Sequence, residues 1–181
     1  MIQRFENAVP KIGRGVFVAP TAVVVGDVVL GDDASVWHNA VVRGDIHWIR
    51  IGARVNLQDG AIVHVESGSC PTIVEDDVSV GHGAILHGCT IRAGSLIGMG
   101  ATVLNDAVIG PGSLVAAGAV VRERFEAPPG SLVAGVPAVV KRALTDEECA
   151  RVARTADNYV GYKNRYLAAN GEAVEVNGGT R

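Results

Sequence analysis

Large aliphatic residues recur every six positions along most of this chain. Seventeen of them follow this spacing, which is interrupted only by two short insertions and one step of five residues: Val18, Val24, Leu30, Val36, Val42, Ile51, Leu57, Val63, Val74, Val80, Leu86, Ile91, Ile97, Val103, Ile109, Val115 and Val121. An amphipathic helix needs a period near 3.6 residues and a half-buried strand a period of two, so neither explains the pattern. A period of six predicts units of one short strand and one turn, stacked as a parallel β-helix.

Three such units make one triangular coil, and each repeating aliphatic side chain points into a narrow prism. Successive coils stack at about 4.8 Å, so the core is a column of Val, Ile and Leu. The composition agrees, because aromatic residues are only 4% of the chain while hydrophobic residues reach 48%. Glycines are abundant, and six are predicted at sharp turns: Gly26, Gly31, Gly52, Gly81, Gly98 and Gly110.

The repeat stops after Val121, and Pro128-Pro129-Gly130 predicts a turn out of the coil. Thr145 and Glu148 form a capping box that predicts a helix start. An apolar stripe at helical spacing follows, made of Cys149, Val152, Ala153, Ala156 and Val160. The predicted organisation is a β-helix with a connecting segment over 1–143, a helix over 144–168 packed on the prism, and a disordered tail over 169–181.

Charge and cysteine content limit the possible partners and the compartment. The net charge of −3 leaves no basic stripe for phosphates, so we expect no nucleic acid or membrane partner. The N-terminal segment has no charged leader followed by an apolar run, and no stretch approaches the roughly 18 apolar residues of a membrane span. Cys70, Cys89 and Cys149 are odd in number and lack CxxC spacing, which favours a reduced, cytoplasmic compartment.

Three of the five histidines lie between residues 64 and 87. Counting coils from Val63 to Leu86 places His64 and His87 on the same face of adjacent coils, about 4.8 Å apart in backbone. His82 falls on the preceding face and cannot easily reach the pair within one chain. In a threefold homotrimer, His82 of a neighbouring chain is predicted to complete the cluster.

Three imidazoles that leave one position open are the ligand set of a catalytic zinc site, in which water is the fourth ligand. Co²⁺ and Fe²⁺ accept the same ligands. The alternative for any single histidine is an ordinary hydrogen-bonded residue, and His38 and His47 are interpreted in this way because neither fits the stack.

Three segments carry a family resemblance: VVRGDIHWIRIGARVNLQDGAIVHVE, VSVGHGAILHGCTI and LIGMGATVL. They resemble the γ-class carbonic anhydrase-like family of left-handed β-helical proteins, over about residues 10–168. The resemblance implies a left-handed coil and a homotrimer with three sites. It also implies that His64, His82 and His87 bind the metal between subunits, and that the reaction is the reversible hydration of CO₂ to bicarbonate.

The resemblance and the chemistry of the reaction together suggest roles for nearby polar residues. Gln58 is expected to orient the attacking water-derived nucleophile. Arg43 and Asp45 resemble the family's interface ion pair, with Arg43 also available to bicarbonate, and Asp59 is expected to join that network. Since RGD and QDG are also good turn sequences, a purely structural role for Asp45 and Asp59 is an equal alternative.

Two features depart from the best-characterised enzymes of the family. Their long acidic loop after the first ligand is replaced by the short segment 66–71, and Ile46 stands where they carry a glutamate. Glu66 is a candidate for proton transfer, against the alternative of a solvated loop residue. Tyr159 is a candidate to reach the site from the helix, although packing is the favoured interpretation.

Three other functions remain open. Segment 131–138 resembles the closing segment of hexapeptide acyltransferases, although these enzymes need no cluster of three histidines. Some relatives in the family hydrolyse acyl-CoA thioesters with the same ligands. The missing acidic loop is also compatible with a metal-binding assembly subunit of low activity.

Overall fold

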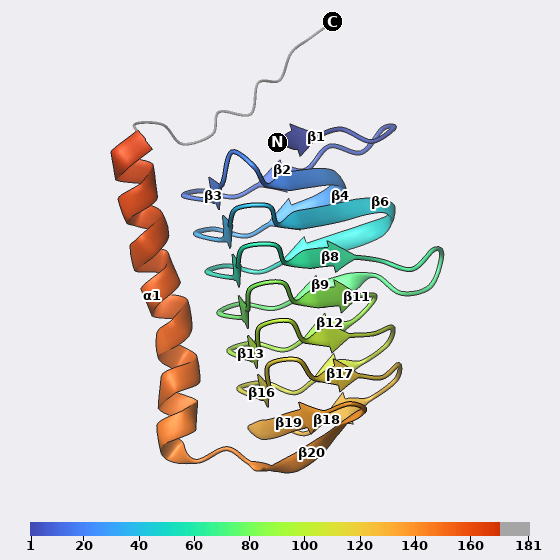
Figure 1. The fold of residues 1–181 in the computed structure, drawn as a ribbon. Helices are drawn as coiled ribbons and strands as arrows, with labels where there is room; N and C mark the ends of the chain where they lie inside the picture. Colours follow the sequence, from blue (N-terminus) through green and yellow to red (C-terminus); the bar gives the residue numbers. More distant parts are fainter. Residues whose placement is uncertain (171–181) are drawn as a thin grey trace, which may run out of the picture.

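Short strands stacked into a three-sided prism make up residues 1–143, and one long helix runs along its side (Figure 1). The computed structural model of the protein describes residues 1–170. Helix α1 spans Asp146–Asn170. The predicted fold class, a left-handed parallel β-helix with a C-terminal helix, is confirmed.

The strands of the prism are short, apart from β4 and β6. They are β1 Ile2–Gln3, β2 Lys11–Ile12, β3 Phe17–Val18, β4 Val23–Leu30, β5 Ser35–Val36, β6 Val41–Ile51, β7 Asn56–Leu57, β8 Ile62–His64, β9 Thr72–Val74, β10 Ser79–Val80, β11 Ile85–His87, β12 Thr90–Ile91, β13 Leu96–Ile97, β14 Thr102–Val103, β15 Val108–Ile109, β16 Leu114–Val115, β17 Val120–Val121, β18 Glu126–Ala127, β19 Ser131–Gly135 and β20 Ala138–Ala143.

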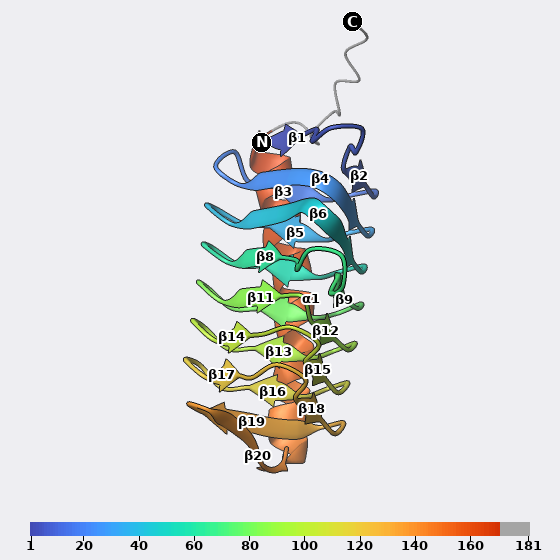
Figure 2. The same ribbon diagram turned by 90° about the vertical axis from the view of Figure 1, so that its right-hand side faces the viewer.

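Each side of the prism is one stack of strands. The helix face is β3-β5-β7-β10-β13-β16-β19, one strand per turn of the coil, closed at its end by the antiparallel strand β20. The histidine face contains β8, β11, β14 and β17, and the third face contains β9, β12, β15 and β18. Figure 2 shows these last two stacks well separated. The long strands β4 and β6 bend around a corner and contribute to both.

All seventeen repeating aliphatic residues are buried, which confirms the predicted core. The predicted end of the coil is wrong, because the repeat continues through Ala127 and Val133. Ala127 pairs with Ile109, and Val133 pairs with Val115 in the stack beside it. Pro128-Pro129-Gly130 therefore turns a corner inside the last coil. Alanine is too small to stand out in a pattern of large aliphatic residues, and this hid the final turn.

Five of the six glycines expected at sharp turns have a different role. Of the six, only Gly26 has a positive φ, of 84°. At the others an added Cβ would collide with the neighbouring coil, as at Gly98, where it would lie 2.4 Å from the backbone nitrogen of Ala117. The corners themselves use left-handed residues that include non-glycines, among them Asp33 and Asp77.

The capping box at the start of α1 is present as predicted. The backbone N–H of Thr145 donates to the Glu148 carboxylate at 2.9 Å, and the N–H of Glu148 donates to the Thr145 hydroxyl at 3.3 Å. Arg142 also donates to Glu148 through both terminal nitrogens. These bonds, those from Arg142 first, lower the pKa of Glu148 to about 2.

The buried stripe of α1 differs in part from the predicted one. Val152 and Ala156 are buried, but Cys149 and Ala153 are exposed. The stripe instead continues toward the C-terminal end through three further residues, Tyr159, Lys163 and Leu167. Lys163 can be buried because the long stem of a lysine lies along apolar surface. A search for apolar residues does not find it, because its side chain is charged.

Two ion pairs fix α1 to the prism. The Lys163 side chain is only 1% exposed, and its ammonium donates to Asp33 at 2.8 Å. Arg54 bonds both Asp77 on the prism and Asp157 on the helix. A buried ammonium needs such a partner, because an unpaired charge there would be costly. The helix is therefore held in one position along the coil.

Residues 171–181, which make up most of the predicted tail, lie outside the described residues, whereas 169 and 170 belong to α1. Within 1–170, no helix is both long and apolar enough to cross a membrane. The three cysteines are free, and burial raises the pKa of the Cys89 thiol to about 12.

Two glycine substitutions should change stability in opposite directions. Gly98→Ala should destabilise the protein by about 1–3 kcal/mol, because the new methyl meets backbone that cannot move aside. Gly161→Ala should stabilise it by about 0.5–1 kcal/mol, because this helical glycine faces open space. Thermal unfolding of both variants beside the parent measures the effect. Equal shifts for the two would contradict the packing role of Gly98.

The protein should lose stability in acid as the Glu148 carboxylate becomes protonated. Its pKa is lower in the folded state than its usual value of 4.5, so its contribution is fully present above about pH 4.5 and is lost as pH falls toward 2. Glu148→Gln should be less stable than the parent at pH 7, and this difference should shrink as the pH approaches 2. Urea unfolding at several pH values measures it, and a difference that does not vary with pH would contradict the assignment.

Candidate metal centre

Two histidines occupy matching positions on adjacent coils of the histidine face. Strand β11 pairs with β8 so that Leu86 lies beside Val63 and His87 lies beside His64, which confirms the predicted stacking. The ring atoms His64 Nδ1 and His87 Nε2 are 3.3 Å apart. The spacing of the coils therefore brings two imidazole nitrogens face to face.

The other nitrogen of His64 is bound to a carboxylate. His64 Nε2 lies 3.0 Å from Asp45 Oδ1, and the other oxygen of Asp45 is paired with Arg43. Burial alone would raise the pKa of Asp45, but the hydrogen bonds from His64 and Arg43 outweigh it and hold that pKa below its usual value. An ionised carboxylate can only accept, so Nε2 carries the hydrogen of neutral His64. Its Nδ1 then presents a lone pair to His87.

The outer nitrogen of His87 also has an acceptor. His87 Nδ1 lies 2.6 Å from Asn105 Oδ1, and Asn105 Nδ2 donates to Glu66 Oε2 at 3.3 Å. The hydrogen of a neutral His87 is therefore on Nδ1, and Nε2 presents its lone pair to His64. Sequence reasoning missed Asn105, because one polar residue after β14 belongs to no motif.

With both rings neutral, the two facing nitrogens are both acceptors, and a cation between them would remove their repulsion. Tetrahedral zinc binds imidazole nitrogen at 2.0–2.1 Å, which places two such ligands about 3.3 Å apart. The observed separation between His64 Nδ1 and His87 Nε2 is 3.3 Å. The donor type and the spacing of this pair fit a zinc-like ion.

His82 lies at a different corner, after β10 on the helix face. His64 and His87 instead end β8 and β11 on the histidine face, so His82 belongs to a different side of the prism from the pair. Within residues 1–170, no group of three or more His, Cys, Asp or Glu side chains is arranged to hold a metal. The His82 ring is about half exposed, and its Nδ1 lies 2.8 Å from Asp59 Oδ2.

His64, His82 and His87 nevertheless share one feature: one ring nitrogen faces a carboxylate or amide oxygen. Metal-binding histidines commonly have such a partner, because it fixes the tautomer and the ring orientation. The remaining histidines differ. His38 Nδ1 contacts the Thr21 hydroxyl at 3.3 Å, and His47 Nδ1 accepts the backbone N–H of Trp48 at 2.8 Å.

Gln58 and Tyr159 lie on the side of the prism near Asp59. Gln58 is buried, and its amide donates to Asn56 Oδ1 at 3.0 Å. Tyr159 and Asp59 line one cavity of about 630 Å³, together with the aromatic residues Trp37, Tyr162 and Tyr166. Burial, with smaller effects from Asp59 and Tyr162, raises the pKa of Tyr159 to about 12. Tyr159 is therefore protonated at neutral pH, and it packs edge-on against Trp37.

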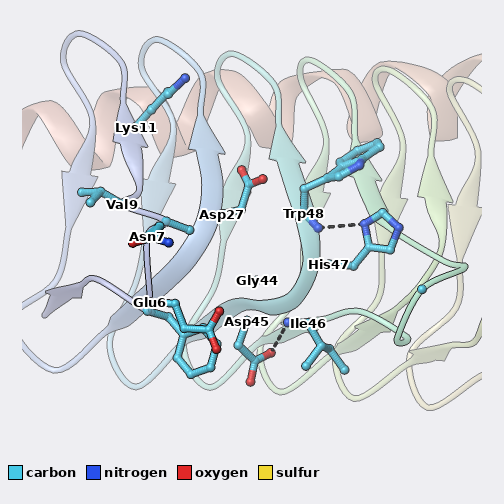
Figure 3. A pocket seen from close by; sticks show the side chains of 13 residues that line it. Glu6, Asn7, Val9, Lys11, Asp27, Gly44, Asp45, Ile46, His47 and Trp48 are labelled. Atoms are coloured by element: carbon cyan, nitrogen blue, oxygen red, sulfur yellow. Dashed lines mark hydrogen bonds between the residues drawn. The ribbon is translucent and has the colours of Figure 1, made fainter.

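A second cavity, of about 720 Å³, opens beside Asp45. Figure 3 shows Asp45 and Ile46 on its wall, with His47 and Trp48 further along β6. The Ile46 side chain is exposed. It presents an apolar surface at the position where the best-characterised enzymes of the resembled family carry a glutamate. Glu66 does not line this cavity. Its carboxylate is held by Asn105 and by the backbone N–H of Ser67.

Comparison with known proteins first places the chain among hexapeptide-repeat proteins. It matches the family described as bacterial transferase hexapeptide (six repeats) over residues 10–44 and 88–123. A solved hexapeptide transferase family protein from Anaplasma phagocytophilum shares its fold with a TM-score of 0.89 and 34% identity, covering 92% of this chain and 98% of that one.

Sequence relatives define the family more narrowly. The chain is 52% identical to a probable carbonic anhydrase of Methanocaldococcus jannaschii, over 82% of this chain and 93% of the relative. It is 41% identical to the mitochondrial γ carbonic anhydrase 1 of Arabidopsis thaliana, over 95% of this chain but only 64% of that protein's length. The chain belongs to the γ-class carbonic anhydrase family.

Proposed function

We propose that the protein is a homotrimer that binds a divalent metal ion between subunits and hydrates CO₂ reversibly to bicarbonate. The observation that carries the proposal is the pair of ring nitrogens, His64 Nδ1 and His87 Nε2, which lie 3.3 Å apart. Family membership supports the reaction, because the relatives compared above are named as carbonic anhydrases.

The outer surface of the histidine face supports self-association. One aliphatic ladder runs beside the histidines in register from coil to coil, formed by Val23, Val41, Ile62, Ile85 and Val120, with Thr102 as the polar member. Ile62 is 41% exposed in the single chain. Burying this row against a second copy would remove apolar surface from water. A threefold arrangement would also bring His82 of the partner subunit to the pair.

Three imidazole nitrogens and one open position suit Zn²⁺, and Co²⁺ or Fe²⁺ would accept the same donors. When bound at such a site, a divalent metal lowers the pKa of water enough to supply a nucleophile at neutral pH. The chain's own contribution is to hold the three rings. Asp45 orients His64, Asp59 orients His82, and Asn105 orients His87.

The other predicted residues take roles around this centre in the proposal. Gln58, fixed by Asn56, would orient the nucleophile through an uncharged amide. Arg43 would attract bicarbonate while it remains paired with Asp45. Glu66 is tied to Asn105, which favours a structural role over free proton transfer. Tyr159 would form an uncharged part of the cavity wall beside Asp59. The cytoplasmic location stays a prediction.

A second candidate function is the hydrolysis of an acyl thioester. The aromatic cavity beside Asp59, of about 630 Å³, is far larger than CO₂ requires, and its rings would suit an apolar acyl group. The same metal-activated water would attack the acyl carbonyl. The structural likeness to transferases and the short loop keep acyl transfer and a low-activity assembly subunit as weaker alternatives.

Metal-loaded protein should hydrate CO₂. Protein purified anaerobically and loaded with Zn²⁺, Co²⁺ or Fe²⁺ should show metal-dependent hydration in stopped flow, and His64→Ala should lose both metal and activity. His47→Ala is the matched control, because this ring lies outside the cluster. A fully metallated protein that hydrates no CO₂ but cleaves acyl-CoA would support the second candidate instead.

Mixing two inactive variants tests the shared site. His82→Ala and His64→Ala should each be inactive, but in a mixed trimer one interface combines an intact His64 and His87 pair with an intact His82. Random assembly of equal amounts should restore about one site in four. Metal content and hydration of the co-expressed protein measure this. Zero recovery from well-mixed trimers would place all the ligands within one subunit.

A further inference from the structure

We infer that Asn105 is a positioning residue of the metal centre, which it serves by fixing the ring of His87 in the tautomer that binds metal. This inference rests on the proposed function and deepens it. Asn105 touches His87 on one side and Glu66 on the other, at 2.6 Å and 3.3 Å. It follows β14, one coil beyond β11, so the stacking that aligns the histidines also delivers its side chain.

Glu66 decides which way the Asn105 amide points. An amide has a donor end and an acceptor end, and a neutral imidazole nitrogen can play either role, so the contact with His87 alone is ambiguous. An ionised carboxylate only accepts hydrogen bonds. The NH₂ group of Asn105 must therefore face Glu66, and its oxygen must face His87. His87 is left with its hydrogen on Nδ1 and with a free lone pair on Nε2.

Glu66 is itself held in place by the short loop after β8. Its backbone N–H donates to the carbonyl of Cys70 at 3.1 Å, and its Oε1 accepts the N–H of Ser67 at 3.1 Å. Its second oxygen, Oε2, is then directed at Asn105. In this chain the loop supplies one fixed carboxylate.

The residue after His87 has no side chain, and this leaves room for Asn105. Gly88 follows His87 with a φ of 59°, and a Cβ there would lie only 2.6 Å from Asn105 Oδ1. The Gly88 N–H is bonded to the Thr72 hydroxyl at 2.9 Å, so the turn is fixed. A side chain at position 88 would block the contact between Asn105 and His87.

Removing the acceptor should weaken metal binding. Asn105→Leu leaves the Nδ1 hydrogen of His87 without its partner, and the loss of such an outer partner commonly costs 10–100-fold in metal affinity. We expect a loss of that size for Zn²⁺, measured by chelator competition. The absorption spectrum of the Co²⁺-loaded protein should change as well, because the ring is no longer held. Asn105→Ala repeats the test if the leucine variant folds poorly.

A double variant separates positioning from packing. Asn105→Asp with Glu66→Gln keeps the net charge, an acceptor facing His87 and a donor facing residue 105, so it should restore Zn²⁺ affinity and the Co²⁺ spectrum. Asn39→Asp is the control, because Asn39 is an exposed asparagine at a corner of the prism, where a new carboxylate meets solvent. It should leave both readouts unchanged.

The outcomes distinguish this inference from the proposed function. If the parent protein binds no metal, the proposed function fails, and this inference fails with it. If the parent binds Zn²⁺ and hydrates CO₂ while Asn105→Leu retains full affinity and an unchanged Co²⁺ spectrum, only the role of Asn105 is overturned. A double variant as weak as Asn105→Leu would also overturn it, since the hydrogen-bond polarity would then not matter.

Discussion

The register between neighbouring coils is the constraint on which the rest of the structure depends. Each strand donates and accepts backbone hydrogen bonds along the prism, while a column of buried aliphatic side chains prevents a slip of one residue, because such a slip would turn that column outward. Pairing Val63 with Leu86 therefore also pairs His64 with His87. The same registration brings Asn105 to the outer nitrogen of His87.

The polar groups around the histidines turn two ring nitrogens toward each other. Asp45 and Asn105 each take the hydrogen of one ring, and this leaves two lone pairs opposed at 3.3 Å. A protein that needed only stability would place an aliphatic pair at these positions, as the same face does at Val41 and Ile62. Local rules of stability are commonly broken at functional sites. Under the proposed function, metal binding and folding stability would therefore be coupled.

Much of the architecture could be predicted because the repeat is rigid and local. Counting coils was enough to stack His64 on His87 despite the insertion between them, and the capping box placed the start of α1. The last coil was missed, since Ala127 falls below the size that marks a core position. The buried stripe of α1 could not be predicted at Lys163, because a charged residue is normally exposed and this one buries its stem.

The site was less predictable than the fold, for a physical reason. Histidine carries its chemistry in its identity, but Asn105 acts only through an orientation that Glu66 imposes. No spacing rule connects residues 66 and 105 until three-dimensional stacking brings them together. Likewise, Gly88 matters for the volume it leaves free, which a sequence does not display.

The insertion between β8 and β9 has a consequence for how such a protein can change. Both ends of the segment are fixed, because His64 and Thr72 belong to strands that are paired with their neighbours, and the Thr72 hydroxyl also donates to the His64 carbonyl. Residues can be gained or lost between these two anchors while the strand pairing that stacks His64 on His87 is kept, but Glu66 in this segment also fixes Asn105. A change in the length of this segment would therefore alter the surroundings of the histidine pair, through Glu66 and Asn105, without altering the coil that stacks the two rings.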